Sequence, residues 1–245
     1  MQIDPELIRI TRPNSLESLP GKSPVGSRMA IMLGGAAARA GEKLKAKIMA
    51  IAAHRLGVAI DQLRYEGGDV LAHDGRRFTW DEMVELAHRQ YHNLPDGMDP
   101  GLASFDIMQV PTGDALPVDD KVQMYPCYSF EFHLLLVSFD PIIGRPDIHS
   151  YVIGHDCGTV INPAIVSGMT YGGIAHGIGA ALFEEFAYDT NGQLLTQSFL
   201  DYLMPSSHEV PAIQIVKHCT PSPHTVFGQK GSGESGYLGA PAAVS

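Results

Sequence analysis

The sequence predicts an α+β fold in which mixed helices and antiparallel sheets form two lobes, approximately residues 1–120 and 121–245. Helical periodicity dominates residues 34–56, whereas short apolar runs separated by glycine, proline and aspartate are typical of strands elsewhere. Helices and strands do not alternate regularly and no segment repeats, which argues against a parallel βα fold. With 245 residues, the chain is long enough to bury a substantial core.

The first lobe is expected to contain two helices and several short strands. In the first helix, residues 34–56, apolar side chains recur at three- and four-residue steps, at Ala36, Ala40, Leu44, Ile48, Ile51, Ala52 and Leu56. The strands that follow are separated by turns at Gly67-Gly68 and Asp74-Gly75. Thr79 with Glu82 is a capping-box pattern and predicts a helix that runs to about His92. Residues 93–120, rich in proline, glycine and aspartate, predict a long loop that is either a binding segment or a boundary between lobes.

The second lobe is expected to begin with two antiparallel strands. Aromatic and aliphatic residues in 128–138 predict a buried strand, and residues 148–153 predict a second one. Asp140-Pro141 and Gly144 interrupt the chain between them, so we expect a hairpin connection.

A helix and a further strand complete the predicted elements. Asn162 and Pro163 predict the start of the helix, with asparagine as the cap and proline at the first helical position. This helix is expected to reach about Phe186. Asn191-Gly192 then indicates a hairpin with a type I′ turn, and residues 213–218 predict another strand.

The helix after Asn162 carries an unusual set of glycines, at Gly168, Gly172, Gly173, Gly177 and Gly179. Each glycine costs about 0.5–1 kcal/mol relative to alanine inside a helix. Gly168 and Gly172 lie one turn apart, as do Gly173 and Gly177, so two sides of the helix present bare backbone. We therefore expect something to pack very closely here, either another part of the fold or a ligand.

Composition argues against several classes of partner. The formal net charge of −10 argues against nucleic acids and anionic membranes. No apolar run approaches the ~18 residues of a membrane span, and the first residues lack the pattern of a secretory signal. The three cysteines, Cys127, Cys157 and Cys219, have neither metal-ligand spacing nor an even number for pairing. We therefore expect a cytoplasmic protein with reduced thiols.

Residues 228–236, Gly-Gln-Lys-Gly-Ser-Gly-Glu-Ser-Gly, place the carboxylate of Glu234 among four glycines. Glycine permits positive φ and close approach of a ligand to the backbone, at an entropic cost that folding alone gives little reason to bear. A helix-forming tail follows the run, so Glu234 is expected near a helix start. Taken alone, the run is either a solvated surface turn or a functional loop.

Three further blocks precede this loop, at residues 155–163 (HDCGTVINP), 168–179 (GMTYGGIAHGIG) and 198–205 (SFLDYLMP). With the Glu234 loop, they resemble the C-terminal half of the molybdenum hydroxylase large subunit, the family of xanthine dehydrogenase, aldehyde oxidase and aerobic carbon monoxide dehydrogenase. Residues 23–28, before a small-residue helix, resemble the pterin-contacting segment of this family. The resemblance implies that residues 1–245 form the second, C-terminal molybdopterin-binding domain.

The resemblance implies that Glu234 is a general base, which takes a proton from a metal-bound hydroxide while an electron-poor carbon is hydroxylated. It also implies a set of cofactor-binding residues: Ser23, Val25, Gly26, Ser27, Arg28, Met169, Gly172, Gly173, His176, Lys230, Gly231 and Gly233. Backbone amides near a helix start suit the phosphate of the pterin. Lys230 would influence the Glu234 carboxylate electrostatically if it folded back toward it. No residue of this chain is expected to ligate a metal.

Two positions depart from the family pattern, in which glutamines occupy the places of Met169 and His176. Met169 cannot donate an amide hydrogen bond, so a contact made there in other members would be missing or replaced. His176 would either substitute as a donor or be an ordinary core histidine. The family uses the block that contains His155, Asp156 and Cys157 as scaffold, so we expect structural roles for these three.

The resemblance also implies components outside this chain, because the family's longer large subunit holds its cofactor between two halves. We expect a partner subunit with the other molybdopterin-binding half, an iron–sulfur subunit with [2Fe–2S] clusters, an FAD subunit and a small-molecule substrate. The cofactor is expected to be a molybdenum pyranopterin, in the form of molybdopterin cytosine dinucleotide. Aldehydes, N-heterocycles, carbon monoxide and acyl-CoA all stay open as substrates.

Two other functions stay open on the sequence alone. The chain would be a non-catalytic remnant or interaction subunit with the same fold if the departures at Met169 and His176 prevent productive cofactor binding. A hydrolase independent of metals would use Glu234 with His155 or His224, but no nucleophile motif accompanies these residues.

Overall fold

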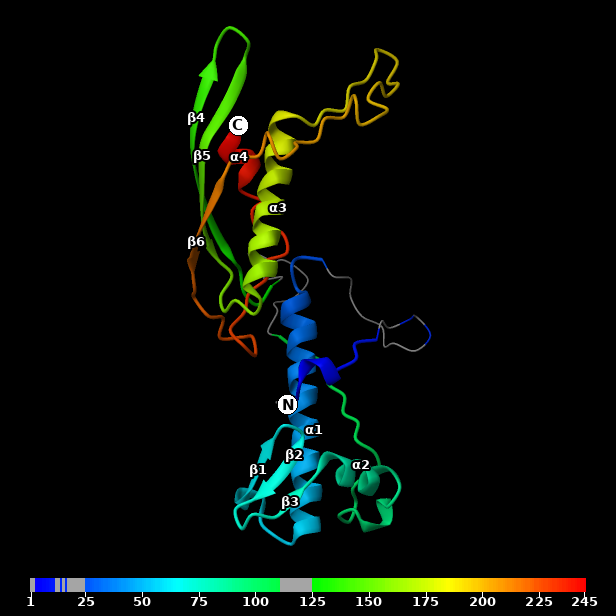
Figure 1. The fold of residues 1–245 in the computed structure, drawn as a ribbon. Coiled ribbons are helices and arrows are strands. Elements are labelled where there is room, and N and C mark those ends of the chain that lie inside the picture. The colour runs from blue at the N-terminus through cyan, green and yellow to red at the C-terminus, as the bar shows by residue number, and fades with distance from the viewer. Residues whose placement is uncertain (1–2, 12–13, 15, 17–24, 111–124) are drawn as a thin grey trace, which may run out of the picture. The chain divides into compact units, whose positions relative to one another are not determined.

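The computed structural model describes residues 3–11, 14, 16, 25–110 and 125–245, so the predictions for Ser23 and residues 111–120 lie outside its described residues. The chain divides into two compact units, which Figure 1 shows. The first comprises Met1–Ser23 with Leu33–Met108, and the second comprises Pro24–Met32 with Gln109–Ser245. All described candidate site residues belong to the second unit.

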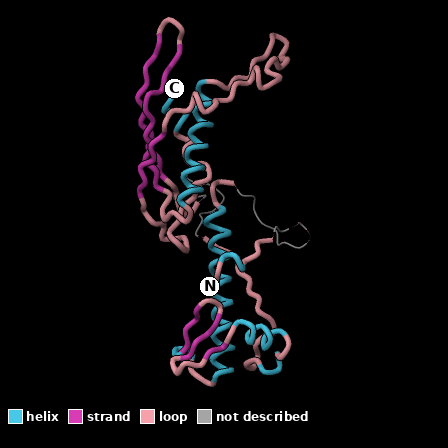
Figure 2. The backbone as a smooth tube through the Cα atoms, viewed as in Figure 1, coloured by secondary structure: helices cyan, strands magenta, loops and turns pink. Residues whose placement is uncertain are grey.

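The first unit combines helices with a small sheet (Figure 2). Its main elements in chain order are α1 (Met29–Leu56, with Met29–Met32 counted in the second unit), β1 (Leu63–Glu66), β2 (Asp69–Ala72), β3 (Arg77–Phe78) and α2 (Trp80–His88). Short 3-10 turns occur at Pro5–Leu7, Ile60–Gln62 and Tyr91–Asn93. The strands pair in the order β1-β2-β3 and are antiparallel throughout, as predicted. Helix α1 begins earlier than predicted, because Arg28 O already accepts hydrogen bonds from the N–H groups of Ile31 and Met32.

The predicted capping box starts helix α2. Thr79 Oγ1 accepts a hydrogen bond from Glu82 N–H at 3.3 Å, and the Glu82 carboxylate accepts one from Thr79 N–H at 2.9 Å. The helix ends at His88 rather than His92, because the chain turns there into the 3-10 segment Tyr91–Asn93. Apolar side chains from both helices, the sheet and the segment after α2 form the core of this unit: Ile48, Ile51, Ala52, Leu63, Tyr65, Val70, Ala72, Phe78, Met83, Leu86, Ala87 and Leu94.

The second unit is built on a three-stranded sheet. Its elements are β4 (Phe130–Asp140), β5 (Arg145–Asp156), α3 (Pro163–Leu182), β6 (Ile213–His218) and α4 (Ala240–Val244). Strands β4 and β5 form the predicted antiparallel hairpin, and β6 occupies the predicted residues. Strand β6 pairs with β5 in parallel, so this sheet is mixed, whereas the predicted fold class has antiparallel sheets. The long connection through α3 makes this possible, because parallel strands need a crossover.

Helix α3 lies alongside the sheet in Figure 1 and shares its core. Asn162 Oδ1 accepts a hydrogen bond from Ile165 N–H at 3.1 Å, which confirms the predicted cap. The helix ends at Leu182 rather than Phe186, because two successive N–H groups bond to Gly179 O and close it. The core contains Tyr151, Ile153, Ile174, Ile178 and Ala240. None of the described helices is long and apolar enough to cross a membrane.

One face of strand β4 is exposed, although the sequence predicts a buried strand. Side chains alternate along a strand, so Glu131 and His133 point toward the core side and their neighbours point away. The outward side chains include Phe130, Phe132, Leu134 and Leu136, and Phe132 is 69% exposed. The core cluster occupies the opposite face, and this apolar row stays exposed, although Lys230 Nζ lies 5.1 Å from the centroid of the Phe130 ring.

The turn at Asn191-Gly192 is not of type I′. Such a turn requires positive φ at both central residues, and here Gly192 has a φ of 81° but Asn191 does not have a positive φ. The Asp189 carboxylate instead accepts a hydrogen bond from Asn191 N–H at 2.8 Å. The flanking residues form a single bridge between Tyr188 and Leu194 rather than two strands.

Candidate active site

Ser27 and Glu234, 207 positions apart in the sequence, are joined by two hydrogen bonds. Ser27 Oγ donates to Glu234 Oε2 at 2.7 Å and accepts from Glu234 N–H at 3.0 Å. Ser27 also has a φ of 54° and is the sole non-glycine residue with positive φ in the described part of the chain. Such a conformation costs on the order of 1–3 kcal/mol and concentrates at functional sites. The pair therefore marks a candidate active site.

Glycines of the 228–236 loop make room for Ser27. A Cβ atom at Gly231 would lie 2.5 Å from Ser27 O, and one at Gly233 would lie 3.3 Å from Ser27 Oγ. The side chain of Met169 on α3 also borders this place, because its Cε would lie 3.5 Å from a Cβ at Gly233. The structure thus brings Ser27, Gly231, Gly233, Glu234 and Met169 together.

The residues that follow Glu234 pack directly against the glycines on one side of α3. A Cβ at Gly173 would collide with Ser235 O and would lie 2.8 Å from Tyr237 N. One turn later, a Cβ at Gly177 would overlap the side chain of Ala240. The close packing predicted for this side is therefore supplied by the chain itself.

Lys230 is buried and turned toward Asp156, so it does not fold back toward Glu234. Its Nζ lies 3.4 Å from Asp156 Oδ1. Burial raises the pKa of Asp156, but hydrogen bonds from Thr220 and Gly158 and the charge of Lys230 outweigh it and hold that pKa well below its usual range. Among the described residues, no cation forms an ion pair with Glu234.

The remaining predicted residues lie around this centre or beside it. His176 is exposed, so it is not a buried core histidine, and its ring packs edge-on against Tyr237 with centroids 6.2 Å apart. Gly26 precedes Ser27 with a φ of 63°. Val25 is exposed, while Arg28 is half-buried. The carbonyl oxygen of Arg28 accepts the first hydrogen bonds of α1.

The block of residues 155–157 makes contacts within the chain. His155 is buried, and its Nε2 lies 2.9 Å from Ser235 Oγ. Cys157 O accepts a hydrogen bond from Lys230 N–H at 2.8 Å, and burial raises the pKa of its thiol. These contacts tie the end of β5 to the 228–236 loop. Of the other thiols, Cys127 is half-buried and Cys219 is exposed.

Sequence reasoning missed Glu131 and His133 on β4. Glu131 Oε2 accepts a hydrogen bond from Gly236 N–H at 2.9 Å and lies 3.0 Å from His133 Nε2. His133 Nδ1 lies 2.7 Å from the hydroxyl of Tyr151. The signal was the Phe-Glu-Phe-His run of residues 130–133, because polar residues two apart in an apolar strand share one face.

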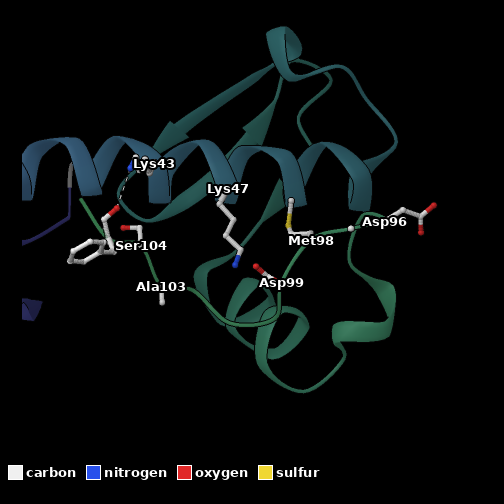
Figure 3. Close-up of a pocket in the computed structure, with 9 residues that line it drawn as sticks. Lys43, Lys47, Asp96, Met98, Asp99, Ala103 and Ser104 are labelled. Atoms are coloured by element: carbon white, nitrogen blue, oxygen red, sulfur yellow. Dashed lines mark hydrogen bonds between the residues drawn. The ribbon is translucent and has the colours of Figure 1, made fainter. Parts of the chain in front are cut away.

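A hollow lies in the first unit, away from the candidate active site, between α1 and the chain after α2 (Figure 3). This open groove of about 500 Å³ is lined by Lys43, Lys47, Asp96, Gly97, Met98, Asp99, Ala103, Ser104 and Phe105. Lys43 Nζ pairs with Asp106 at 2.7 Å and donates to Phe105 O at 3.2 Å. Such contacts hold the described part of the predicted 93–120 loop along α1.

Comparison with known proteins adds to this geometry. Residues 1–211 match the family model described as the molybdopterin cofactor-binding domain. The chain belongs to this family. It is 34% identical over 98% of its length to the nicotine 6-hydroxylase large subunit of Paenarthrobacter nicotinovorans, and 31% identical over 97% to the carbon monoxide dehydrogenase large chain of Hydrogenophaga pseudoflava. It covers 28% of each of these proteins.

Solved structures agree with the family assignment. A Cu,Mo-CO dehydrogenase aligns with a TM-score of 0.78 and 29% identity, over 94% of this chain and 27% of that one. Quinoline 2-oxidoreductase from Pseudomonas putida 86 aligns with a TM-score of 0.71 and 33% identity, over 89% of this chain and 26% of that one. This molybdopterin cofactor-binding domain therefore has the fold of part of a molybdenum hydroxylase large subunit.

The side of α3 that carries Gly168 and Gly172 leaves room for a molybdopterin cofactor to approach the backbone. Gly168 and Gly172 are exposed, and a Cβ at either position would have no atom within 4 Å. A ligand can therefore reach the backbone there without meeting a side chain. Glu234 is also exposed, and Met169 between the two regions has no hydrogen-bond donor to offer. The residues present fit such a cofactor except for the donor that Met169 lacks.

Proposed function

We propose that this domain supplies the general base of a molybdenum hydroxylase, Glu234, and part of the wall around its cofactor. The observation that carries the proposal is the Ser27–Glu234 pair, a strained backbone and an exposed carboxylate held together from distant segments. The names of the relatives, a nicotine hydroxylase and a carbon monoxide dehydrogenase, support the reaction class. Oxidative hydroxylation of a small molecule, with oxygen from water, is the activity that we assign to the complete enzyme.

The proposed chemistry gives each described residue a limited task. The bound molybdenum cofactor would supply the two-electron oxidation of the substrate carbon. Ser27 Oγ holds Glu234 Oε2, so Oε1 is the atom that we assign to proton uptake. No described cation pairs with this carboxylate, so no ion pair has to be broken before it accepts a proton.

Further residues would bind the cofactor itself. The backbone of Val25, Gly26 and Arg28 would contact its phosphate at the start of α1, where N–H groups and the helix dipole favour an anion. The open backbone at Gly172 would face the pterin, and His176 would offer a ring N–H in place of the family's glutamine. A molybdopterin cytosine dinucleotide is the form that we propose.

The proposal requires the rest of the large subunit, with the other molybdopterin-binding half. The exposed apolar row of β4 supports this, because patches of this kind mark interaction surfaces. Phe130 and Leu136 at its two ends are 66% and 65% exposed. Subunits with [2Fe–2S] clusters and FAD would pass the electrons on, and a cytoplasmic location fits the reduced thiols.

One departure from the family pattern, at Met169, favours a second function. Because Met169 borders Glu234's loop without a donor, the domain would be a non-catalytic interaction module if this loss prevents cofactor binding. The two functions differ in a measurable quantity, the molybdenum content of the complete protein.

We predict that the complete large subunit, purified with its partner subunits, contains about one molybdenum and one pterin per molybdopterin-binding site. These 245 residues expressed alone should be poorly soluble and free of both, because the apolar face of β4 and one wall of the pocket would be open. Elemental analysis by mass spectrometry and pterin fluorescence measure the two contents. A complete subunit without molybdenum would support the non-catalytic module, and a soluble, loaded monomer of this chain would contradict the need for a second half.

A further inference from the structure

Three consecutive residues of the Glu234 loop are each held by a different part of the second unit. Ser27, ahead of α1, bonds to Glu234. On β5, His155 Nε2 lies 2.9 Å from the hydroxyl of the next residue, Ser235. On β4, Glu131 Oε2 accepts the N–H of Gly236 at 2.9 Å. Ser235 and Gly236 are buried while Glu234 is exposed, so the second and third contacts act behind the exposed carboxylate.

The Glu131 contact belongs to a chain of buried polar groups. Burial raises the pKa of Glu131, but hydrogen bonds from His133 and Gly236 outweigh it, so the pKa lies below its usual value and the carboxylate is an acceptor. His133 therefore donates through Nε2 to Glu131, and its Nδ1 shares a hydrogen bond of 2.7 Å with the Tyr151 hydroxyl, whose pKa burial raises to about 12. Each of these three side chains therefore has a hydrogen-bond partner within the group.

The loop has no spare room on its other sides. Gly236 has a φ of 85°, and a Cβ there would lie 2.5 Å from Thr170 O on α3. A Cβ at Gly239 would lie 2.5 Å from Cδ2 of the His133 ring. The backbone behind Glu234 is therefore fixed between α3 and the polar face of β4, and Glu131 is the charged group that bonds to it.

We infer that Glu131 is a positioning residue for Glu234: its hydrogen bond to Gly236 N–H sets where the Glu234 carboxylate stands. This inference rests on the proposed function, because it needs Glu234 to be the base. Displacing a catalytic carboxylate by ~1 Å lowers the catalytic rate on the order of 10²-fold, so loss of the Glu131 contact should have a measurable kinetic effect. Glu131 itself does not touch the reacting atoms.

The test uses the complete, cofactor-loaded enzyme with Glu131→Ala, Glu131→Asp and Glu131→Gln. Alanine removes the acceptor and aspartate withdraws it by one methylene, so both should lower kcat by about 10- to 100-fold while KM changes less than about threefold. Glutamine keeps an acceptor oxygen and should restore kcat to within about threefold of wild type. Amide hydrogen exchange over residues 235–239 should quicken in the alanine and aspartate variants and stay slow in the glutamine variant.

A double-mutant cycle separates this inference from the proposed function. Glu131→Ala should have almost no further effect on kcat in a Glu234→Gln background, because it acts through Glu234. Glu184→Ala is the matched control, since it also removes a carboxylate that accepts a hydrogen bond, here from the Tyr202 hydroxyl at 2.7 Å, and it should leave kcat unchanged. An equal loss in both backgrounds, or unchanged exchange of residues 235–239, would overturn the positioning role. A Glu234→Gln enzyme with normal turnover would instead refute the proposed function.

Discussion

Glu234→Gln lowers the turnover of the complete, cofactor-loaded enzyme by about 10²–10⁴-fold, the usual contribution of a general base, while assembly and molybdenum content stay unchanged. Glutamine has nearly the same shape, and its amide oxygen still accepts the Ser27 hydroxyl, which donates to Oε2 in the wild-type protein. It cannot take up a proton at the second position. Anaerobic single-turnover mixing with a substrate that reduces the enzyme measures this effect on the chemical step itself.

The matched control for this variant is Glu184→Gln. Glu184 follows the end of α3 and accepts a hydrogen bond from the Tyr202 hydroxyl, so the substitution makes the same chemical change away from the Ser27 contact. Its turnover should stay within about threefold of wild type. Glu234 is not the base if its glutamine variant behaves like this control.

Gly173→Ala destabilises the complete enzyme and lowers its turnover. The new methyl group would collide with the backbone of Ser235 and Tyr237, which cannot move aside as a flexible side chain could. Overpacking of this kind costs about 1–3 kcal/mol, so the part of the thermal transition that reports on this domain should move to lower temperature. Because Ser235 adjoins Glu234, a backbone shift that relieves the collision also displaces the base. Thermal melts and kcat at saturating substrate measure both effects.

Gly172→Ala is the matched control on the same helix. No atom lies within 4 Å of a Cβ at this position, so alanine should stabilise α3 within this domain by up to about 1 kcal/mol through its higher helix propensity. In the complete enzyme, it should lower cofactor content if the pterin packs on this side, as we propose. Equal melting temperatures of the Gly172→Ala and Gly173→Ala enzymes would contradict the packing of the loop against α3.

The sequence predicted the elements with strong local signals. The Thr79–Glu82 capping box, the Asn162 cap and the β4–β5 hairpin depend on neighbouring residues, and all three are confirmed. The family blocks were sufficient for the molybdopterin-binding fold, which the comparisons confirm. Helix ends were less well predicted, because local contacts close α2 and α3 before their periodic patterns stop.

Features that depend on distant contacts could not be predicted. The collision that makes Gly173 necessary comes from residues more than sixty positions later, whereas its neighbour Gly172 meets nothing, and both look alike in sequence. Lys230 pairs with Asp156 rather than Glu234, because the strand end at Asp156 lies beside the loop only in the folded chain. The apolar residues of β4 look in sequence like those of a buried strand, although one face of the strand is exposed. We propose that another part of the complete large subunit covers this face.

An experimental structure of the complete enzyme with its cofactor bound tests the central claim most directly. We predict that Glu234 is the protein carboxylate nearest the molybdenum, with Ser27 still hydrogen-bonded to its Oε2 and with Oε1 within hydrogen-bond reach of the reacting group, directly or through one water. A structure with another carboxylate in that place, and with Glu234 turned toward solvent or toward a subunit contact, would contradict the assignment of Glu234 as the base.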